Sequence, residues 1–269
     1  MGYLPDTLIL NIPLGYSINY IPGYIAFFTP SITSLFFLIP YLISIILSTN
    51  KKTKKSYIIL LCLGVIISLI IGRRALIVII LISPIILIIL NSLVNLNYRL
   101  IIKFVALLVL LVFVFSVIIF IILSIDEVNL RIEAFGLAGG NSARYKQFFA
   151  LLNGWSENPI LGSGFGVNAD IIRSKSVPGA YELTYVARLF QTGIVGSTIY
   201  ILLISFIYYS FIKIMKVNKK YINYFLPVLT GTTAFLIATF TNPYIGSFDG
   251  LWILFYPLAL INNALLKNN

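Results

Sequence analysis

The chain has 269 residues, of which 59% are hydrophobic and 10% are charged, and its formal net charge is +11. A soluble domain carries roughly 25% charged residues, so this composition excludes an ordinary soluble protein. One cysteine and no histidine exclude a disulfide framework, a cysteine or histidine metal site and histidine-based catalysis. Any chemistry must therefore use carboxylates, arginines, lysines, tyrosines or hydroxyls, and we expect no cofactor.

Apolar runs of about 20 residues recur along the chain, and this is the length that crosses a hydrocarbon core of about 30 Å. They predict an all-α, polytopic integral membrane protein that forms one transmembrane domain over residues 1–269. Seven spans are expected, at about 31–49, 56–71, 75–90, 104–125, 183–212, 221–240 and 251–265. The first 30 residues are interrupted by four prolines, which predicts an interfacial or re-entrant segment.

The basic residues predict the orientation of these spans, because cytoplasmic loops of membrane proteins are enriched in lysine and arginine. With the lysine cluster at 51–55 in the cytoplasm, all eight carboxylates and the long loop at 126–182 lie outside. Eight of the 19 basic residues also lie outside, namely Arg73, Arg74, Arg131, Arg144, Lys146, Arg173, Lys175 and Arg188. Positive charge kept on that side indicates an exterior site for an anion, and we expect no nucleic acid partner.

Within the long loop, the segment from Ser142 to Trp155 has apolar residues at helical spacing. The predicted stripe consists of Tyr145, Phe148, Phe149, Leu152 and Trp155. Such a helix would lie in the membrane interface, with Arg144 off the stripe and facing a lipid phosphate. The alternative is a surface helix with solvated charges.

Further features of the sequence suggest binding or catalysis. Gly162, Gly164 and Gly166 have the spacing of an anion-binding backbone nest, although alternating glycines also form plain turns. Arg73 and Arg74 join two apolar spans, where they either reach the interface or hold a pyrophosphate.

Arg188 lies one to two turns into the fifth span, where a partner is expected: Glu182, Asp249 or the substrate. Glu182 stands just before that span, as part of a structural salt bridge or as a catalytic base.

Four stretches in this order resemble the O-antigen polymerase and O-antigen ligase superfamily. They are GRRAL at 72–76, W-x-x-NPILGSGFG ending at Gly166, ELTYVARLFQTGIVG at 182–196, and TNPY at 241–244 followed by Trp252. Together they cover about residues 72–256. Members show a similar glycine-rich turn, followed by a polar residue about ten positions before a T-G-x-x-G.

The resemblance implies a GT-C-like glycosyltransferase of the bacterial cytoplasmic membrane that acts at its outer face. Its substrates would be undecaprenyl-diphosphate-linked oligosaccharides, and neither a metal nor a nucleotide sugar would be needed. Arg73, Arg74 and Arg144 would hold the diphosphate. In such a reaction we expect a carboxylate, Glu182 first and Asp249 second, to take the proton of the acceptor hydroxyl. The product would be O-antigen, capsule or exopolysaccharide, with a flippase and a chain-length regulator as further partners.

Two differences from the family refine this expectation. Ligases of the superfamily carry a histidine where Glu182 stands here, which favours a repeat-unit polymerase over a ligase-type transferase. Members also usually have ten or more spans, so the resemblance suggests a member that lacks N-terminal helices. The alternatives from other classes are a transporter or flippase of lipid-linked glycans, and an inactive gene fragment. The nearly charge-free spans disfavour the transporter.

Overall fold

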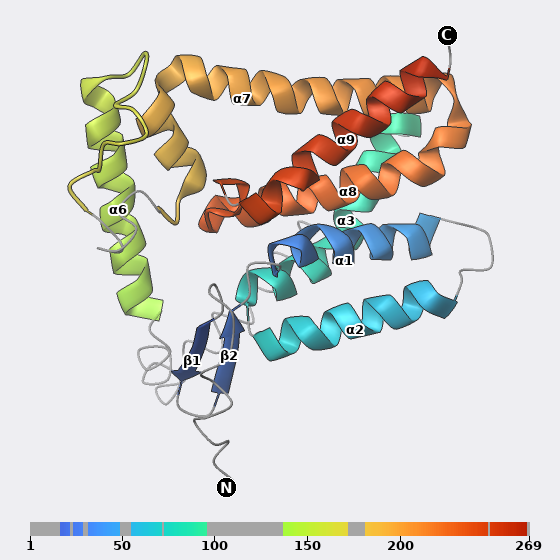
Figure 1. The fold of residues 1–269 in the computed structure, drawn as a ribbon, viewed down its shortest axis with the longest axis horizontal. Coiled ribbons are helices and arrows are strands. Elements are labelled where there is room, and N and C mark those ends of the chain that lie inside the picture. Colours follow the sequence, from blue (N-terminus) through green and yellow to red (C-terminus); the bar gives the residue numbers. More distant parts are fainter. Residues whose placement is uncertain are drawn as a thin grey trace, which may run out of the picture.

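The computed structural model describes residues 17–21, 24–28, 32–48, 55–71, 73–95, 137–171, 181–246 and 248–267. The described residues are mainly helical, as expected (Figure 1). The longer elements are β1 (Ser17–Ile21), β2 (Tyr24–Phe28), α1 (Ile32–Ser48), α2 (Lys55–Ile71), α3 (Arg74–Asn95), α6 (Leu137–Glu157), α7 (Thr184–Val217), α8 (Ile222–Ala238) and α9 (Phe248–Leu266). Short 3-10 turns join the last three helices: η2 (Lys219–Tyr221), η3 (Thr239–Thr241) and η4 (Tyr244–Gly246).

Four of the described helices are long and apolar enough to cross a membrane, as in a multi-pass membrane protein. They are Ala75–Asn95, Thr184–Val217, Lys219–Ala238 and Phe248–Leu266. The apolar helices α1 and α2 have 17 residues each and are shorter than this. Six of the seven expected spans thus fall on helices, and the span expected at 104–125 lies outside the described residues.

The N-terminal hairpin is the exception to the all-α prediction. β1 pairs antiparallel with β2, so that Ser17 lies opposite Phe28 and Ile21 lies opposite Tyr24. Both strands are rich in isoleucine, tyrosine and phenylalanine, which favour strands, and they flank a Pro-Gly pair typical of turns. The expectation of an interfacial or re-entrant segment for residues 1–30 missed this hairpin because it considered only the breaking effect of the prolines.

The main core lies between α1, α3, α8, α9 and the second half of α7. Phe36 and Phe37 of α1 and Phe235 of α8 are almost fully buried in it. Gly231 of α8 permits the close approach of α1, because a Cβ there would lie 2.8 Å from the Phe37 carbonyl oxygen. Small residues at helix contacts are typical of packing inside membranes, where lipid competes with side chains for apolar contacts.

The two ends of the bundle differ in chemistry. Lys213, Lys216, Lys219 and Lys220 cluster where α7 ends and α8 begins. In Figure 1, α6 lies at the opposite end and runs across the direction of α1, α2 and α8. The first residues of α7, the end of α8 and the start of α9 also lie at that end. The lysines at 213–220 and the helix that carries Arg144 therefore lie at opposite ends of the bundle.

A kink divides α7 into two parts. Gly193 has φ 62° and ψ −165°, a conformation that glycine adopts readily and that residues with a Cβ rarely adopt. The part after Gly193 is long enough to cross about 30 Å of hydrocarbon at about 1.5 Å per residue. Arg188 lies in the short part before the kink, and not inside the long helix as the sequence had suggested.

Candidate active site

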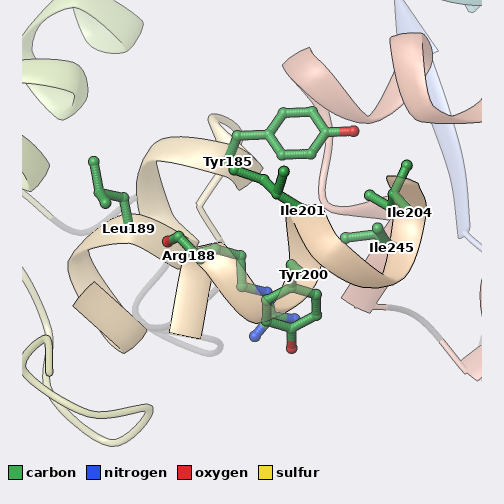
Figure 2. Close-up of a pocket in the computed structure, with 8 residues that line it drawn as sticks. Tyr185, Arg188, Leu189, Tyr200, Ile201, Ile204 and Ile245 are labelled. Carbon is green, nitrogen blue, oxygen red and sulfur yellow. The ribbon is translucent and has the colours of Figure 1, made fainter. Parts of the chain in front are cut away.

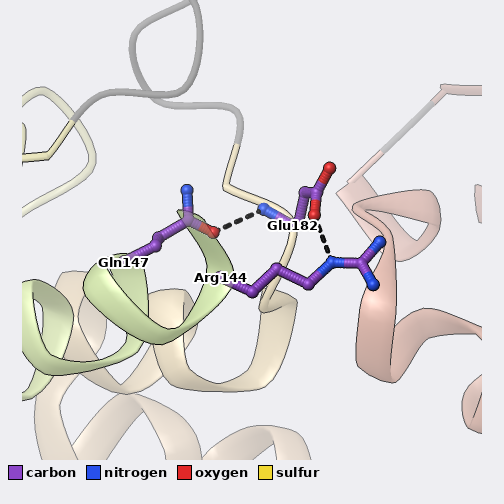
Figure 3. Close-up of polar contacts among 3 residues, drawn as sticks. All are labelled: Arg144, Gln147 and Glu182. Atoms are coloured by element: carbon purple, nitrogen blue, oxygen red, sulfur yellow. Dashed lines mark hydrogen bonds and ion pairs between the residues drawn. The ribbon is translucent and has the colours of Figure 1, made fainter. Parts of the chain in front are cut away.

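Helix α6 and the residue before α7 are joined by a polar contact (Figure 3). Arg144 Nε donates to Glu182 Oε2 at 2.5 Å, and the Glu182 backbone N–H donates to Gln147 Oε1 at 3.1 Å. The Arg144 side chain is 45% exposed and that of Glu182 is 17% exposed. Because the arginine of this pair is nearly half exposed, solvent screens the attraction to about 1 kcal/mol, and an incoming anion can compete with Glu182 for Arg144.

Helix α6 is confirmed, but its buried face differs from the predicted stripe. It begins at Leu137, five residues before the predicted start at Ser142. Gln147, Ala150 and Leu151 are buried, whereas Tyr145, Phe148 and Phe149 are exposed. Gln147 is buried because it binds the Glu182 backbone. Gly154 lies on the same side, where a Cβ would come within 2.6 Å of the Phe190 ring.

The glycine-rich turn after α6 fits closely into the kink of α7. Ser163 N–H donates to Phe190 O, and Gly164 N–H donates to Gln191 O, both at 2.9 Å. In return, Ile194 N–H donates to Pro159 O and Val195 N–H to Ile160 O. A Cβ at Gly162 would lie 2.4 Å from Gly193 N, and one at Gly193 would lie 2.3 Å from Ile160 O. Only glycines allow the two backbones this approach.

This packing gives Gly162 and Gly164 a role other than the predicted anion nest. The amides of Gly162, Ser163 and Gly164 all donate to backbone carbonyls, that of Gly162 to Asn158 O at 2.9 Å. Amides that are already satisfied are not available to an anion. Gly164 and Gly166 face open space, and Gly166 is exposed. The turn therefore positions neighbouring side chains.

Arg188 is held between aromatic rings. Its guanidinium carbon lies 5.0 Å from the ring centroid of Phe165 and 5.8 Å from that of Tyr200, within the range of cation–π attraction. Its Nη1 is 3.5 Å from Gln191 Oε1, and a Cβ at Gly246 would lie 3.2 Å from its Nη2. It makes no ion pair with a carboxylate of the described residues, so the expected partnership with Glu182 or Asp249 is not present.

Arg188 lines an apolar pocket of about 260 Å³ (Figure 2). Tyr185 and Leu189 lie on the same short segment of α7, Tyr200, Ile201 and Ile204 follow the kink, and Ile245 comes from η4. Ser197 also lines the pocket, and its buried hydroxyl has no hydrogen-bond partner among the described residues. The surface of this pocket is almost entirely apolar, so it suits the apolar tail of a ligand, and the Arg188 guanidinium lies beside it between Phe165 and Tyr200.

The segment after α8 brings the remaining sequence motifs to this end. Thr184 Oγ1 donates to Asn242 O at 2.9 Å, and Tyr185 donates to Leu236 O at 2.8 Å. Tyr244 stacks on Phe36 with ring centroids 4.6 Å apart. Burial raises the pKa of the Tyr244 hydroxyl, and the positive charge of Arg73 opposes that rise. Arg73 is thus close to Tyr244, and the four motifs meet at one end of the bundle.

One predicted site residue, Asp249, stays apart from these contacts. Asp249 lies in the first turn of α9, half-buried, and makes no ion pair with another described residue. Arg74 begins α3, and its side chain lies outside the described residues.

Sequence reasoning missed the aromatic partners of Arg188. Tyr200 is twelve residues from Arg188, which is not a contact spacing on one straight helix, and only the kink at Gly193 brings the two together. Phe165 comes from the turn, where nothing in the local sequence indicates its partner. The T-G-I-V-G run was the available signal, because a glycine inside a helical pattern suggests a break.

Comparison of the chain with protein-family models, with curated proteins and with solved structures found no match.

Proposed function

We propose that this protein is a membrane glycosyltransferase that polymerises lipid-diphosphate-linked oligosaccharide repeat units. The observation that carries the proposal is that the Arg188 guanidinium, which has no carboxylate partner among the described residues, lies beside an apolar pocket. A charge so placed is unfavourable near lipid unless an anion joins it. A polyprenyl diphosphate provides both the anion and the apolar chain, and the resemblance to O-antigen polymerases points to the same substrate class.

The reaction is a displacement at the anomeric carbon of the lipid-linked donor. An acceptor hydroxyl oxygen forms the new glycosidic bond, the bond from that carbon to the diphosphate oxygen breaks, and the lipid diphosphate leaves with the electron pair. Negative charge grows on this leaving group, so fixed positive charges near it lower the barrier. Arg188, Arg144 and Arg73 lie at the same end of the bundle for this task, and Arg74 is adjacent in sequence.

Glu182 is the first candidate for the base that takes the proton of the acceptor hydroxyl. It is largely shielded from solvent and is held by its backbone to Gln147 and by its carboxylate to Arg144. When the diphosphate attracts Arg144, the positive charge beside the Glu182 carboxylate moves toward the substrate, which favours transfer of the proton to Glu182. Asp249 is the second candidate. A carboxylate at position 182, where ligases carry histidine, favours the polymerase over a ligase-type transferase.

The wider proposal is a GT-C-like protein of about seven spans in a bacterial cytoplasmic membrane, with residues 126–182 on the exterior side. The product would be O-antigen, capsule or exopolysaccharide. A flippase that delivers the lipid-linked unit and a chain-length regulator are the partners that such a reaction requires. The lysine cluster at 213–220 lies at the end of the bundle opposite α6, and a cytoplasmic position of these lysines supports this orientation.

The test is a reaction with the purified protein in lipid nanodiscs and lipid-linked repeat units from the producing cell. The proposal predicts a ladder of longer lipid-linked products, and Arg188→Ala abolishes it while the protein still accumulates. Lys213→Ala is the matched control, because Lys213 also lies over a tyrosine ring of α7, at the other end. Movement of the substrate across a vesicle membrane without longer products would favour the transporter and contradict the polymerase.

A further inference from the structure

A second pocket lies beside α6, apart from the Arg188 pocket. Its volume is about 370 Å³, and it opens broadly to the surface. Tyr145, Lys146, Phe149 and Asn153 line it from α6, and Asp170 lines it from the segment that follows the glycine-rich turn. At about 100° per residue, these α6 positions lie away from the side that carries Arg144, Gln147 and Leu151. One helix therefore separates this pocket from Glu182.

Two aromatic rings are exposed at this pocket. Tyr145 is 65% exposed and Phe149 is 43% exposed, although large aromatic side chains usually bury most of their area. Their ring centroids are 4.7 Å apart at an interplanar angle of 57°, so each ring supports the other. Exposed, mutually supported rings next to a hollow offer flat apolar faces to a ligand.

The polar groups around these rings are free to bind a ligand. The Asn153 amide, the Asp170 carboxylate and the Lys146 ammonium group make no side-chain hydrogen bond or ion pair with another described residue. Together they supply donors and acceptors within one pocket. A ligand with one weakly polar face and many hydroxyls matches this lining, and a pyranose ring has this chemistry: its C–H groups stack on aromatic faces and its hydroxyls bind amides and carboxylates.

Other occupants fit the pocket less well. A phosphate would meet Lys146, but Asp170 would repel it at the same pocket. An apolar partner helix would bury Lys146, Asn153 and Asp170 without partners, which is unfavourable. Insertion of the rings into the lipid interface uses Tyr145 and Phe149, but requires nothing of Asn153 and Asp170.

We propose that this pocket binds a sugar unit of the oligosaccharide while the end of the chain reacts near Glu182. The inference rests on the proposed function and adds to it a second contact for the glycan, about one helix diameter, roughly 10–12 Å, from the Arg144–Glu182 pair. Binding the chain at a distance from the reacting bond would hold the growing polymer between successive additions.

The test compares Asn153→Ala, Asp170→Asn and Tyr145→Leu in the nanodisc reaction. Each is expected to raise the half-saturating concentration of the lipid-linked oligosaccharide about tenfold, the effect of losing one good polar or stacking contact, with kcat little changed. Glu157→Gln is the matched control, since its side chain is exposed on α6 and does not line the pocket. Tyr145→Leu keeps an apolar residue, so wild-type behaviour of this variant would indicate simple membrane insertion and overturn the stacking role.

A binding experiment keeps the inference testable independently of catalysis. The repeat-unit oligosaccharide, released from its lipid by mild acid, is added to the wild type, and its contacts are followed by saturation-transfer NMR. Transfer to sugar protons that is lost in Asn153→Ala and Asp170→Asn but kept in Arg188→Ala supports the pocket. No transfer to the wild type, or equal transfer in the pocket variants, overturns it. A wild type that binds the sugar but makes no longer products would contradict the polymerase alone.

Discussion

Arg144 and Glu182 are 38 positions apart in sequence, and their side chains meet at 2.5 Å between Nε and Oε2. The contact joins the helix of the long loop to the start of α7, and it leaves almost half of the Arg144 side chain exposed. Within the proposed function, the substrate diphosphate replaces Glu182 as the partner of Arg144, and the fold does not depend on the ion pair.

Arg144→Ala is therefore expected to separate stability from activity. Loss of a partly exposed ion pair should change the free energy of unfolding by no more than about 1 kcal/mol. Long chains should nevertheless disappear from a polysaccharide gel, because the charge that attracts the diphosphate is gone. Unchanged chain length together with a normal protein level would show that Arg144 has no part in substrate binding.

Glu182→Gln tests the base directly. The amide keeps the size of the side chain, and the backbone contact to Gln147 does not depend on the carboxylate. Removal of a general base typically lowers the rate about 10²–10⁴-fold, so kcat in the nanodisc reaction should fall by that factor. Glu157→Gln, at the exposed end of α6, should keep the wild-type rate. A normal kcat for Glu182→Gln would exclude Glu182 as the general base and leave Asp249 as the candidate.

The glycines of the turn and the kink should respond to alanine in a graded way. Gly162→Ala and Gly193→Ala place a Cβ within 2.6 Å of backbone atoms of the other segment at positive φ, so both should unfold at clearly lower temperature. The strained conformation alone contributes about 1–3 kcal/mol of destabilisation. Gly166→Ala has open space and should unfold like the wild type. Equal unfolding temperatures for all three variants, measured on the purified proteins, would contradict the packing of the turn into the kink.

Arg188→Lys keeps the positive charge but loses the planar group that lies over Phe165 and Tyr200. Lysine cannot replace the bidentate, stacked guanidinium at such a site. We expect a loss of activity that is smaller than that of Arg188→Ala but well above the error of the assay, and little loss of stability. If Arg188→Lys is as active as the wild type, positive charge alone is sufficient, and the contacts of the guanidinium with Phe165 and Tyr200 are not needed for function.

The sequence predicted the parts of this architecture that depend on composition and periodicity. Long apolar runs fixed the positions of α1, α2, α3, α7, α8 and α9, and the loop helix was expected within α6. The β1–β2 hairpin was missed because short aromatic strands resemble interfacial segments.

The contacts of the candidate site were harder to predict, because they depend on one backbone angle. Gly193 turns α7 and brings Arg188 to Tyr200. Carbonyl groups next to the same kink accept hydrogen bonds from the Ser163 and Gly164 amides, which the sequence had suggested for an anion nest. The side of α6 that packs against the rest of the protein could not be predicted, because burial there depends on Gln147, whose partner is a backbone amide 35 positions away.

The central claim is that α6 and the Arg188 pocket face the exterior of the cell, and cysteine labelling tests it most directly. In a Cys62→Ser background, which removes the one native thiol, Glu157→Cys and Lys219→Cys place a thiol at opposite ends of the bundle. An impermeant maleimide should label Glu157→Cys in intact cells, and Lys219→Cys only after the membrane is permeabilised. Labelling of Lys219→Cys but not Glu157→Cys in intact cells would place the arginines in the cytoplasm and contradict the account.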